Sequence, residues 1–283
     1  MRLYQRFQVF MLAILILVGF LTGAAWARAE ETLSIMGTGS SIGTMKLMAK
    51  AFQMQHPLAN IEVLPSIGST GAIKAVREGK IDIGLSSRPL KPEERSAEIV
   101  EVPYGRTAFI FGVQDSNPVK GFTLGEIEEI YAGKLRTWPD GTPIRIILRP
   151  LSDAFSAYLA GINPGMKSAS EKAHSISGLF VGSTDQEASA QIEKTPGSFG
   201  TTSSSLIKAE KLRIKALFVD GVAPTPVNVS TGKYPFVMTL SLVYKKDKYG
   251  GLIKDFMRFI FSREGQKLLA ANGHVHLGRI SRR

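Results

Sequence analysis

The chain has 283 residues, 44% of them hydrophobic, and its 35 basic and 24 acidic side chains give a formal net charge of +11. It contains no cysteine, which excludes disulfides, thiol nucleophiles and thiolate metal sites. The basic residues are spread along the chain rather than gathered in runs, which argues against a nucleic-acid-binding surface and fits either solubility or the attraction of anions.

Residues 1–29 have the pattern of a secretory signal peptide. Arg2 and Arg6 precede an uncharged stretch, and Ala27-Arg28-Ala29 supplies the small residues of a cleavage site. An uncleaved membrane anchor is the alternative, because the uncharged stretch is near the lower length limit of a spanning helix. We expect cleavage before Glu30 and release into the periplasm, without a lipid anchor since the chain has no cysteine.

Three short hydrophobic runs open the mature chain, and a turn rich in Gly, Ser and Thr follows each of them. The expected strands cover residues 32–36, 61–64 and 81–85. Hydrophobic residues recur at helical spacing over 45–52 and over 73–77, and Gly79 is expected to stop the second helix. This alternation predicts a mainly parallel sheet that is covered by helices.

A second alternating set follows from about Gly112. Its expected helices cover 124–131, 153–159 and 185–194, and its expected strand covers 144–148. A strand over 236–244 and helices over 252–261 and 264–271 then complete the chain. The irregular stretch from Asp220 to Tyr234 is rich in Pro and Gly and is expected to connect lobes at the surface. The expected fold class is therefore α/β.

The turn from Gly37 to Gly43, Gly-Thr-Gly-Ser-Ser-Ile-Gly, lies between the first expected strand and the first expected helix. Such a turn presents free backbone N–H groups and the positive end of the helix dipole, which together favour a bound anion. Similar turns follow the next two strands, at 66–71 and 86–89. All three turns lie at the carboxyl ends of parallel strands, where ligands bind in doubly wound sheets. We therefore expect a cup of hydroxyl and amide donors.

An oxyanion that has lost its water also needs countercharge, and the planar fork of an arginine grips two oxygens at once. Arg149 stands at the end of the expected strand 144–148 and is the candidate for this role. The alternative is a surface arginine paired with an acid. Arg88 is a second candidate with a weaker case, since the chain after it is expected to be exposed.

Ser41 also fits a different class of site, because Gly39-Ser40-Ser41-Ile42-Gly43 matches the G-x-S-x-G elbow of α/β hydrolases. Its catalytic partners would have to be Asp220 or Asp247, and then His274 or His276. Too few mature residues precede Gly37 to supply the oxyanion-hole loop of that fold. The glycine spacing does not fit a dinucleotide fingerprint, and no cofactor is expected.

The remaining candidates favour structure over chemistry. His274 and His276 lie on one side of a strand without a third ligand, so we expect a solvent-facing end and no metal site. Trp138 is expected to be a packing residue rather than a platform for a ligand.

Four ordered segments resemble the periplasmic phosphate-binding proteins of ABC importers. They are G-T-G-S-S-I-G at 37–43, I-G-S-T-G with G-K-I-D-I-G-L-S-S-R-P-L at 67–90, E-I-E-E-I-Y-A-G-K-L-R-T-W at 126–138, and T-P-G-S-F-G at 195–200. The resemblance runs from about Leu33 to His276. It implies a type II periplasmic-binding-protein fold, with two doubly wound lobes joined by two crossing strands at Thr107–Gly112 and Phe236–Thr239. The implied limits are a signal peptide at 1–29, one lobe at 30–111 and 235–283, and the other at 112–234.

The resemblance also implies a set of ligand-binding residues. In that family the first loop offers a hydroxyl and the next amide, which correspond to Ser41 and Ile42. Ser69 corresponds to a second hydroxyl, beside the amides of the two residues that follow it, and Arg149 matches the anion-gripping arginine. The full expected set is Ser40, Ser41, Ile42, Ser69, Thr70, Gly71, Ser87, Arg149, Ser152 and Asp153.

Two positions depart from the family. Ser87 stands where the family often has an Asp that accepts the proton of phosphate, and Ser152-Asp153-Ala154 shortens the family's Ser-Gly-Thr. We hypothesise that Asp153 supplies the missing acceptor, because a buried carboxylate repels a fully ionised anion and tolerates one that still carries a proton.

The resemblance implies a solute-binding protein, not an enzyme, that captures inorganic phosphate or a related tetrahedral oxyanion. No conspicuous apolar patch or heptad repeat indicates assembly, so we expect a monomer. The protein would deliver that anion to the permease subunits of an ABC importer, with no nucleic acid as partner. A secreted serine hydrolase that uses Ser41 is one alternative. An oxyanion sensor that docks on a receptor is another.

Overall fold

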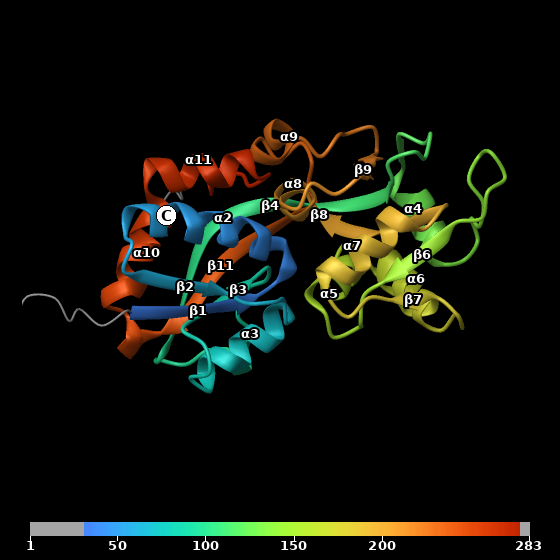
Figure 1. The fold of residues 1–283 in the computed structure, drawn as a ribbon. Helices are drawn as coiled ribbons and strands as arrows, with labels where there is room; N and C mark the ends of the chain where they lie inside the picture. The colour runs from blue at the N-terminus through green and yellow to red at the C-terminus, as the bar shows by residue number, and fades with distance from the viewer. Residues whose placement is uncertain (1–30, 278–283) are drawn as a thin grey trace, which may run out of the picture.

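Residues 31–277 are described by the computed structural model, and they form two α/β lobes that lie side by side (Figure 1). The expected signal peptide lies outside the described residues. One hydrogen-bonded path of strands passes through both lobes in the order β2-β1-β3-β11-β4-β8-β6-β7. Strand β9 lies off this path and pairs with β4. Of the helices in residues 31–277, none combines the length and the apolar character that crossing a membrane requires.

Lobe 1 is built on a parallel core of three strands. Its elements before the crossing are β1 (Glu31–Gly37), α2 (Gly39–Gln55), β2 (Ala59–Val63), α3 (Gly68–Arg77), β3 (Ile83–Ser86) and the short 3-10 helix η1 (Pro92–Glu94). Strand β1 pairs in parallel with both β2 and β3. Helix α3 ends at Arg77 and Gly79 follows with φ of +70°, a conformation that suits glycine, so the predicted stop is confirmed.

The helices of lobe 1 cover both faces of its sheet (Figure 1). The elements after the crossing are η2 (Lys246–Lys248), α10 (Gly251–Phe261) and α11 (Arg263–Ala271). Met45, Met48 and Phe52 of α2 pack with Phe256 of α10 on one face, as the helical spacing predicted. Ile73 of α3 belongs to a separate cluster on the other face.

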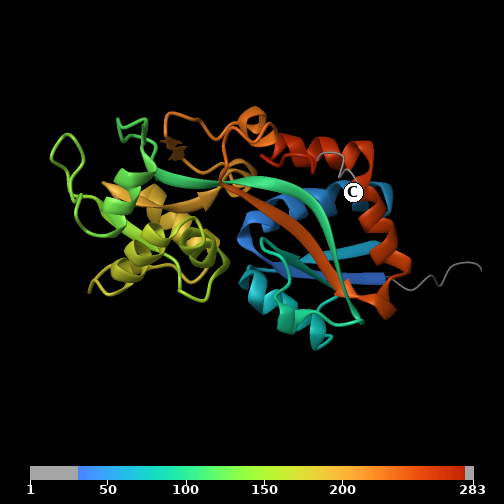
Figure 2. The ribbon, with the colours of Figure 1, turned by 180° about the vertical axis from the view of Figure 1, so that it is seen from behind.

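Two long strands carry the chain between the lobes. The first part of β4 (Ile99–Gln114) pairs antiparallel with β11 (Val237–Lys245), and its second part pairs with β8 (Ser198–Ser203). The change of partner falls between Ala108, opposite Val237, and Phe109, opposite Ser203. Figure 2 shows both strands, green and orange, running through the junction.

Lobe 2 holds the second hydrophobic core. Its elements are β5 (Gly121–Phe122), α4 (Leu124–Tyr131), β6 (Arg145–Leu148), α5 (Ala154–Ala160), α6 (Pro164–His174), β7 (Phe180–Val181), α7 (Asp185–Lys194), β8, α8 (Ser204–Ala209), β9 (Ile214–Ala216), β10 (Phe218–Val219) and α9 (Pro226–Ser230). Trp138 is 3% exposed, stacks on Phe122 at 5.8 Å between ring centroids and donates to the Gly197 carbonyl. It is a packing residue, as predicted.

The stretch from Asp220 to Tyr234 runs over the surface as expected, with most of its residues exposed or half-buried, and it also contains α9. Its last residue, Tyr234, is fully buried and donates to the Phe109 carbonyl. One expectation in this part of the fold was wrong. His274 is not solvent-facing: its side chain is buried and contacts Thr44 at 2.9 Å, since the chain turns back over lobe 1 after α11. His276, two residues on, is exposed.

Candidate functional site

The first loop is held directly over the end of the neighbouring strand. A Cβ atom at Gly37 would lie 2.2 Å from the Leu85 carbonyl oxygen, so only glycine allows the two strands to come this close. Thr38 then donates its N–H to that carbonyl at 2.9 Å, and Ser66 donates its hydroxyl to the Gly37 carbonyl at 2.8 Å. The carboxyl ends of β1, β2 and β3 therefore meet at one edge, as the three predicted turns required.

Ser41 lies fully buried in the first turn of α2. Its Oγ accepts a hydrogen bond from the Tyr104 hydroxyl at 2.6 Å. Burial raises the pKa of Tyr104, so the phenol stays neutral and remains the donor. Because Ser41 accepts here, its own hydroxyl hydrogen is available to another acceptor. The next residue, Ile42, has its side chain in the lobe 1 core.

The second and third turns bring two hydroxyls together. Ser87 donates its N–H to Ser69 Oγ at 3.0 Å, the two Oγ atoms are 3.2 Å apart, and both side chains are buried. Gly71 lies in the first turn of α3, and Thr70 is exposed. In this part of the predicted set of donors, Ser69 and Ser87 therefore form a compact pair, and Thr70 lies beside Ser69 in the sequence.

The chain after Arg88 is mostly exposed, as expected, but the Arg88 side chain itself is largely covered. Its guanidinium makes two bonds to the Glu94 carboxylate, at 2.6 and 2.7 Å, and a third to Thr70 Oγ1 at 3.0 Å. Burial alone would raise the pKa of Glu94, but the Arg88 guanidinium and the Lys91 N–H together outweigh burial and hold that pKa below its ordinary value. The charge of Arg88 is therefore already neutralised within lobe 1.

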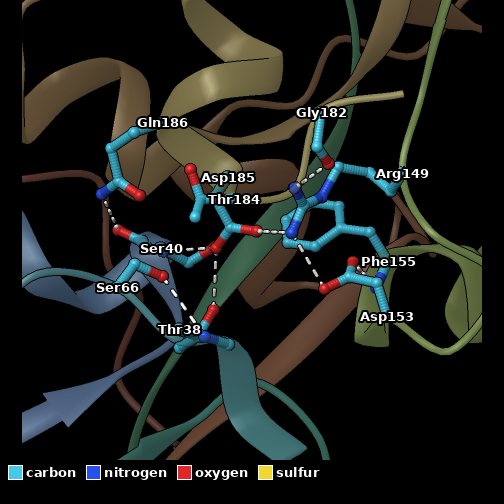
Figure 3. A network of polar contacts seen from close by, with 12 residues as sticks. Thr38, Ser40, Ser66, Arg149, Asp153, Phe155, Gly182, Thr184, Asp185 and Gln186 are labelled. Atoms are coloured by element: carbon cyan, nitrogen blue, oxygen red, sulfur yellow. Dashed lines mark hydrogen bonds and ion pairs between the residues drawn. The ribbon is translucent and has the colours of Figure 1, made fainter. Parts of the chain in front are cut away.

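Arg149 is buried at the end of β6, with 3% of its surface exposed (Figure 3). Nη2 donates to Asp153 Oδ2 at 2.9 Å and to Asp185 Oδ1 at 3.0 Å, and Nη1 donates to the Gly182 carbonyl. Among residues 31–277, Nε of Arg149 has no hydrogen-bond partner. A buried guanidinium thus lies between two carboxylates and keeps a further donor unpaired.

Asp153 points toward Arg149 and lobe 1 rather than toward solvent. Oδ1 accepts from the Phe155 N–H at 2.9 Å, which caps α5, while Oδ2 takes the bond from Arg149. Oδ2 also lies 3.9 Å from where a Cβ at Gly68 would stand, next to Ser69. Ser152 is exposed and lies outside this network.

Asp185 is the central residue of the site that our reading of the sequence missed. It is 5% exposed, and its Oδ2 accepts from Thr38 Oγ1 and from the Ser40 N–H, both at 2.9 Å and both in the opposite lobe (Figure 3). Burial raises the pKa of Asp185, the Asp153 carboxylate adds to this, and the Arg149 guanidinium opposes it. The sequence placed Asp185 at the start of a helix but gave no sign that it reaches the first loop.

The two lobes also contact each other through hydroxyls around Ser40. Ser203 donates to Ser40 Oγ at 3.0 Å, and Ser205 donates to the Ser40 carbonyl at 2.7 Å. Both serines adjoin the start of α8, next to the strand crossing. Ser40 is therefore an interlobe contact through its hydroxyl, its carbonyl and its amide.

The residues proposed for a hydrolase do not come together. The partner of Ser41 is Tyr104, whereas the ring of His274 contacts Thr44 and burial lowers the pKa of that histidine to about 3. Asp220 accepts from the Leu124 N–H at 3.0 Å in lobe 2. Asp247 and His276 are exposed. No Ser-His-Asp arrangement forms around Ser41 in the described part of the chain.

Comparison with known proteins finds relatives that match most of the chain. The chain is 27% identical over 251 residues to the phosphate-binding protein PstS of Bacillus subtilis strain 168, and the alignment covers 87% of this chain and 80% of that protein. It is 25% identical over 269 residues to protein SphX of Synechococcus elongatus, covering 85% and 76%.

Solved structures and a family model agree with these matches. A putative phosphate ABC transporter substrate-binding protein from Clostridium perfringens, solved with bound phosphate, aligns with a TM-score of 0.76 and 28% identity, over 87% of this chain and 100% of that one. That likeness supports the two-lobed α/β architecture described above. A family model described as a PBP superfamily domain matches residues 22–264, and the chain therefore belongs to the PBP superfamily.

Proposed function

We propose that this chain is a solute-binding protein that captures inorganic phosphate, or a related tetrahedral oxyanion, between its two lobes. The observation that carries the proposal is the buried Arg149 guanidinium, which is linked through Asp185 to the N-terminal end of α2 in the opposite lobe and keeps its Nε unpaired within the described residues. A buried cation and a helix N-terminus that converge are the two elements that an anion site requires.

The hydroxyls of the first two turns of lobe 1 suit four-oxygen recognition. Ser41 accepts from Tyr104 and so has a hydrogen to donate, and Ser69 belongs to the second turn at the same edge. We assign the first contacts to the amides and hydroxyls of the first loop, to Ser69 with the amides that follow it, and to Arg149. Ser87 supports Ser69 through its N–H.

The charge of the site favours an anion that still carries a proton. Two carboxylates, of Asp153 and Asp185, face the single guanidinium of Arg149. The Asp153 carboxylate would repel a fully ionised anion, whereas a protonated one can donate its hydrogen to a carboxylate oxygen. We assign that acceptor role to Asp153, which would admit hydrogen phosphate and reject sulfate.

The relatives support both the ligand and the role. One is named a phosphate-binding protein, and the Clostridium perfringens structure is a putative phosphate transporter component with phosphate bound. By likeness to them, the chain would act outside the cytoplasm, bind without turnover and deliver its ligand to an ABC permease. The expected signal peptide at 1–29 would provide the export.

A thermal-shift series tests the proposal directly. Phosphate at a hundred times its dissociation constant adds about 2.7 kcal/mol to the free energy of unfolding, whereas sulfate at the same concentration should leave the melting temperature unchanged. The Arg149→Met variant should show no phosphate shift. Stabilisation by sulfate or by small carboxylates, with none by phosphate, would contradict the assignment of the ligand.

A further inference from the structure

One carboxylate of lobe 2 occupies donors that lobe 1 would offer to a captured anion. Asp185, the first residue of α7, accepts from the hydroxyl of Thr38 and from the amide of Ser40. Its other oxygen accepts from Arg149. The two features assigned to anion binding, the first loop and the guanidinium, are thus bridged by a side chain of the protein itself.

The contact has the chemistry of a helix cap supplied by the other lobe. Thr38 is the N-cap residue of α2, yet its hydroxyl makes no capping bond to its own helix and donates to Asp185 instead. The carboxylate of Asp185 accepts the Ser40 N–H in the first turn of α2. Negative charge at a helix N-terminus is stabilised by the exposed amides and by the helix dipole. Asp185 therefore has the position and the charge of a bound oxyanion.

The fit of the two helix ends is close. A Cβ atom at Gly39 would lie 2.5 Å from Asp185 Cβ and 2.3 Å from Gln186 Oε1, so the start of α7 rests on a position that tolerates no side chain. Gln186 in turn donates to Glu210 Oε1 at 3.0 Å. The bridge is buried and packed on both sides.

We propose that Asp185 is an internal ligand of this site: its carboxylate holds the lobes together when no anion is bound, and a captured oxyanion must displace it. The bridge itself follows from the contacts above, and only the identity of the competing anion rests on the proposed function. Two carboxylates and an oxyanion exceed what one guanidinium can neutralise, so the incoming anion and Asp185 exclude each other.

The distance between the lobes tests the bridge without any ligand. The chain has no cysteine, so Lys74→Cys in lobe 1 and Lys167→Cys in lobe 2, both at exposed positions, can carry spin labels without background. We expect the phosphate-free protein to give one short label-to-label distance. Asp185→Ala and Asp185→Asn should give a longer or broader distribution that phosphate restores.

Glu187→Gln is the matched control, because Glu187 is an exposed acid in the same first turn of α7 and, among residues 31–277, its carboxylate accepts only from the Ser183 N–H. It removes the same charge from the same helix end and should leave the distance unchanged. An Asp185→Ala distance identical to that of the parent protein would overturn the proposal.

Titration calorimetry with inorganic phosphate tests the competition. Asp185→Asn should bind phosphate about tenfold more tightly, the equivalent of one charge-assisted hydrogen bond that no longer has to be broken. Weaker binding by this variant would make Asp185 a contact of the ligand and overturn the competition. If Asp185→Ala opens the lobes but neither protein binds phosphate, the internal ligand stands and the assignment of phosphate fails.

Discussion

The hydroxyl of Tyr104 donates to Ser41 at 2.6 Å, which ties strand β4 to the first loop. Tyr104→Phe removes that donor and leaves the buried Ser41 oxygen without it. We expect a loss of about 1–2 kcal/mol in the free energy of unfolding, measured by urea denaturation. Phosphate affinity should fall as well, because Ser41 is no longer oriented. An unchanged affinity would remove Ser41 from the ligand contacts.

Arg149 holds two carboxylates that would otherwise face each other in a buried site. Arg149→Met should therefore lower the free energy of unfolding at neutral pH by about 3–5 kcal/mol, the usual cost of a buried charge that loses its partner. Adding Asp185→Asn to this variant should recover part of the loss. A double variant as unstable as the single one would show that packing, not charge, is the main role of Arg149.

Arg149→Lys separates charge from geometry. Lysine keeps the positive charge but cannot reach two oxygens with a planar fork. We expect phosphate affinity to fall by about tenfold or more in titration calorimetry, the equivalent of at least one lost charge-assisted hydrogen bond. Affinity close to that of the parent protein would mean that the ligand is held mainly by the amides and hydroxyls of lobe 1.

His274 should make stability depend on pH. Burial lowers the pKa of this histidine to about 3, so in mildly acidic solution the unfolded chain binds a proton there that the folded protein does not. Its contribution to stability is present above the unfolded pKa, and it is lost as pH falls below about 6.5, by about 1.4 kcal/mol per pH unit.

The measurement is the difference in unfolding free energy between the parent protein and His274→Gln from pH 7 to pH 4. The two proteins are compared with each other because Asp185, whose pKa is raised, makes the free energy of unfolding change with pH in the opposite direction. Parallel curves for the two proteins would contradict the assignment to His274.

Substitution of Gly39 provides a way to push the lobes apart without removing a polar group. A Cβ atom at Gly39 would collide with Asp185 and Gln186 of the other lobe, while alanine itself favours the helix. Gly39→Ala should lengthen the label-to-label distance and weaken phosphate binding. Gly125→Ala, in the first turn of α4 with its nearest neighbour at 4.0 Å, is the control and should change neither.

The sequence predicted local structure better than the contacts of the site. Helices α4 and α7 begin and end where expected, because Thr123 and Thr184 cap them in agreement with their hydrophobic spacing. Helix α6 was missed because few hydrophobic residues mark its buried face. Strand β8 was missed because, apart from Phe199, it consists of Ser, Thr and Gly, and it is buried by its place between β4 and β6 in the sheet.

The same reasoning explains which parts of the site were predictable. A recognisable strand or helix adjoins each of Ser41, Ser69 and Arg149. The sequence therefore indicated at which edge of a sheet each residue lies. The bond from Thr38 to Asp185 spans 147 positions, and the bond from Tyr104 to Ser41 spans 63. Contacts between lobes and across a sheet leave no local pattern in a single sequence.

The continuous sheet limits how the protein can move. Because β4 and β11 are paired with each other up to the residue where β4 passes to β8, the joint is a twisted ribbon with its hydrogen bonds in place rather than two independent tethers. A ribbon of this kind resists sliding and shear and yields mainly to bending and twisting. Opening is therefore restricted to a narrow arc, along which the lobes return to the same register each time they close.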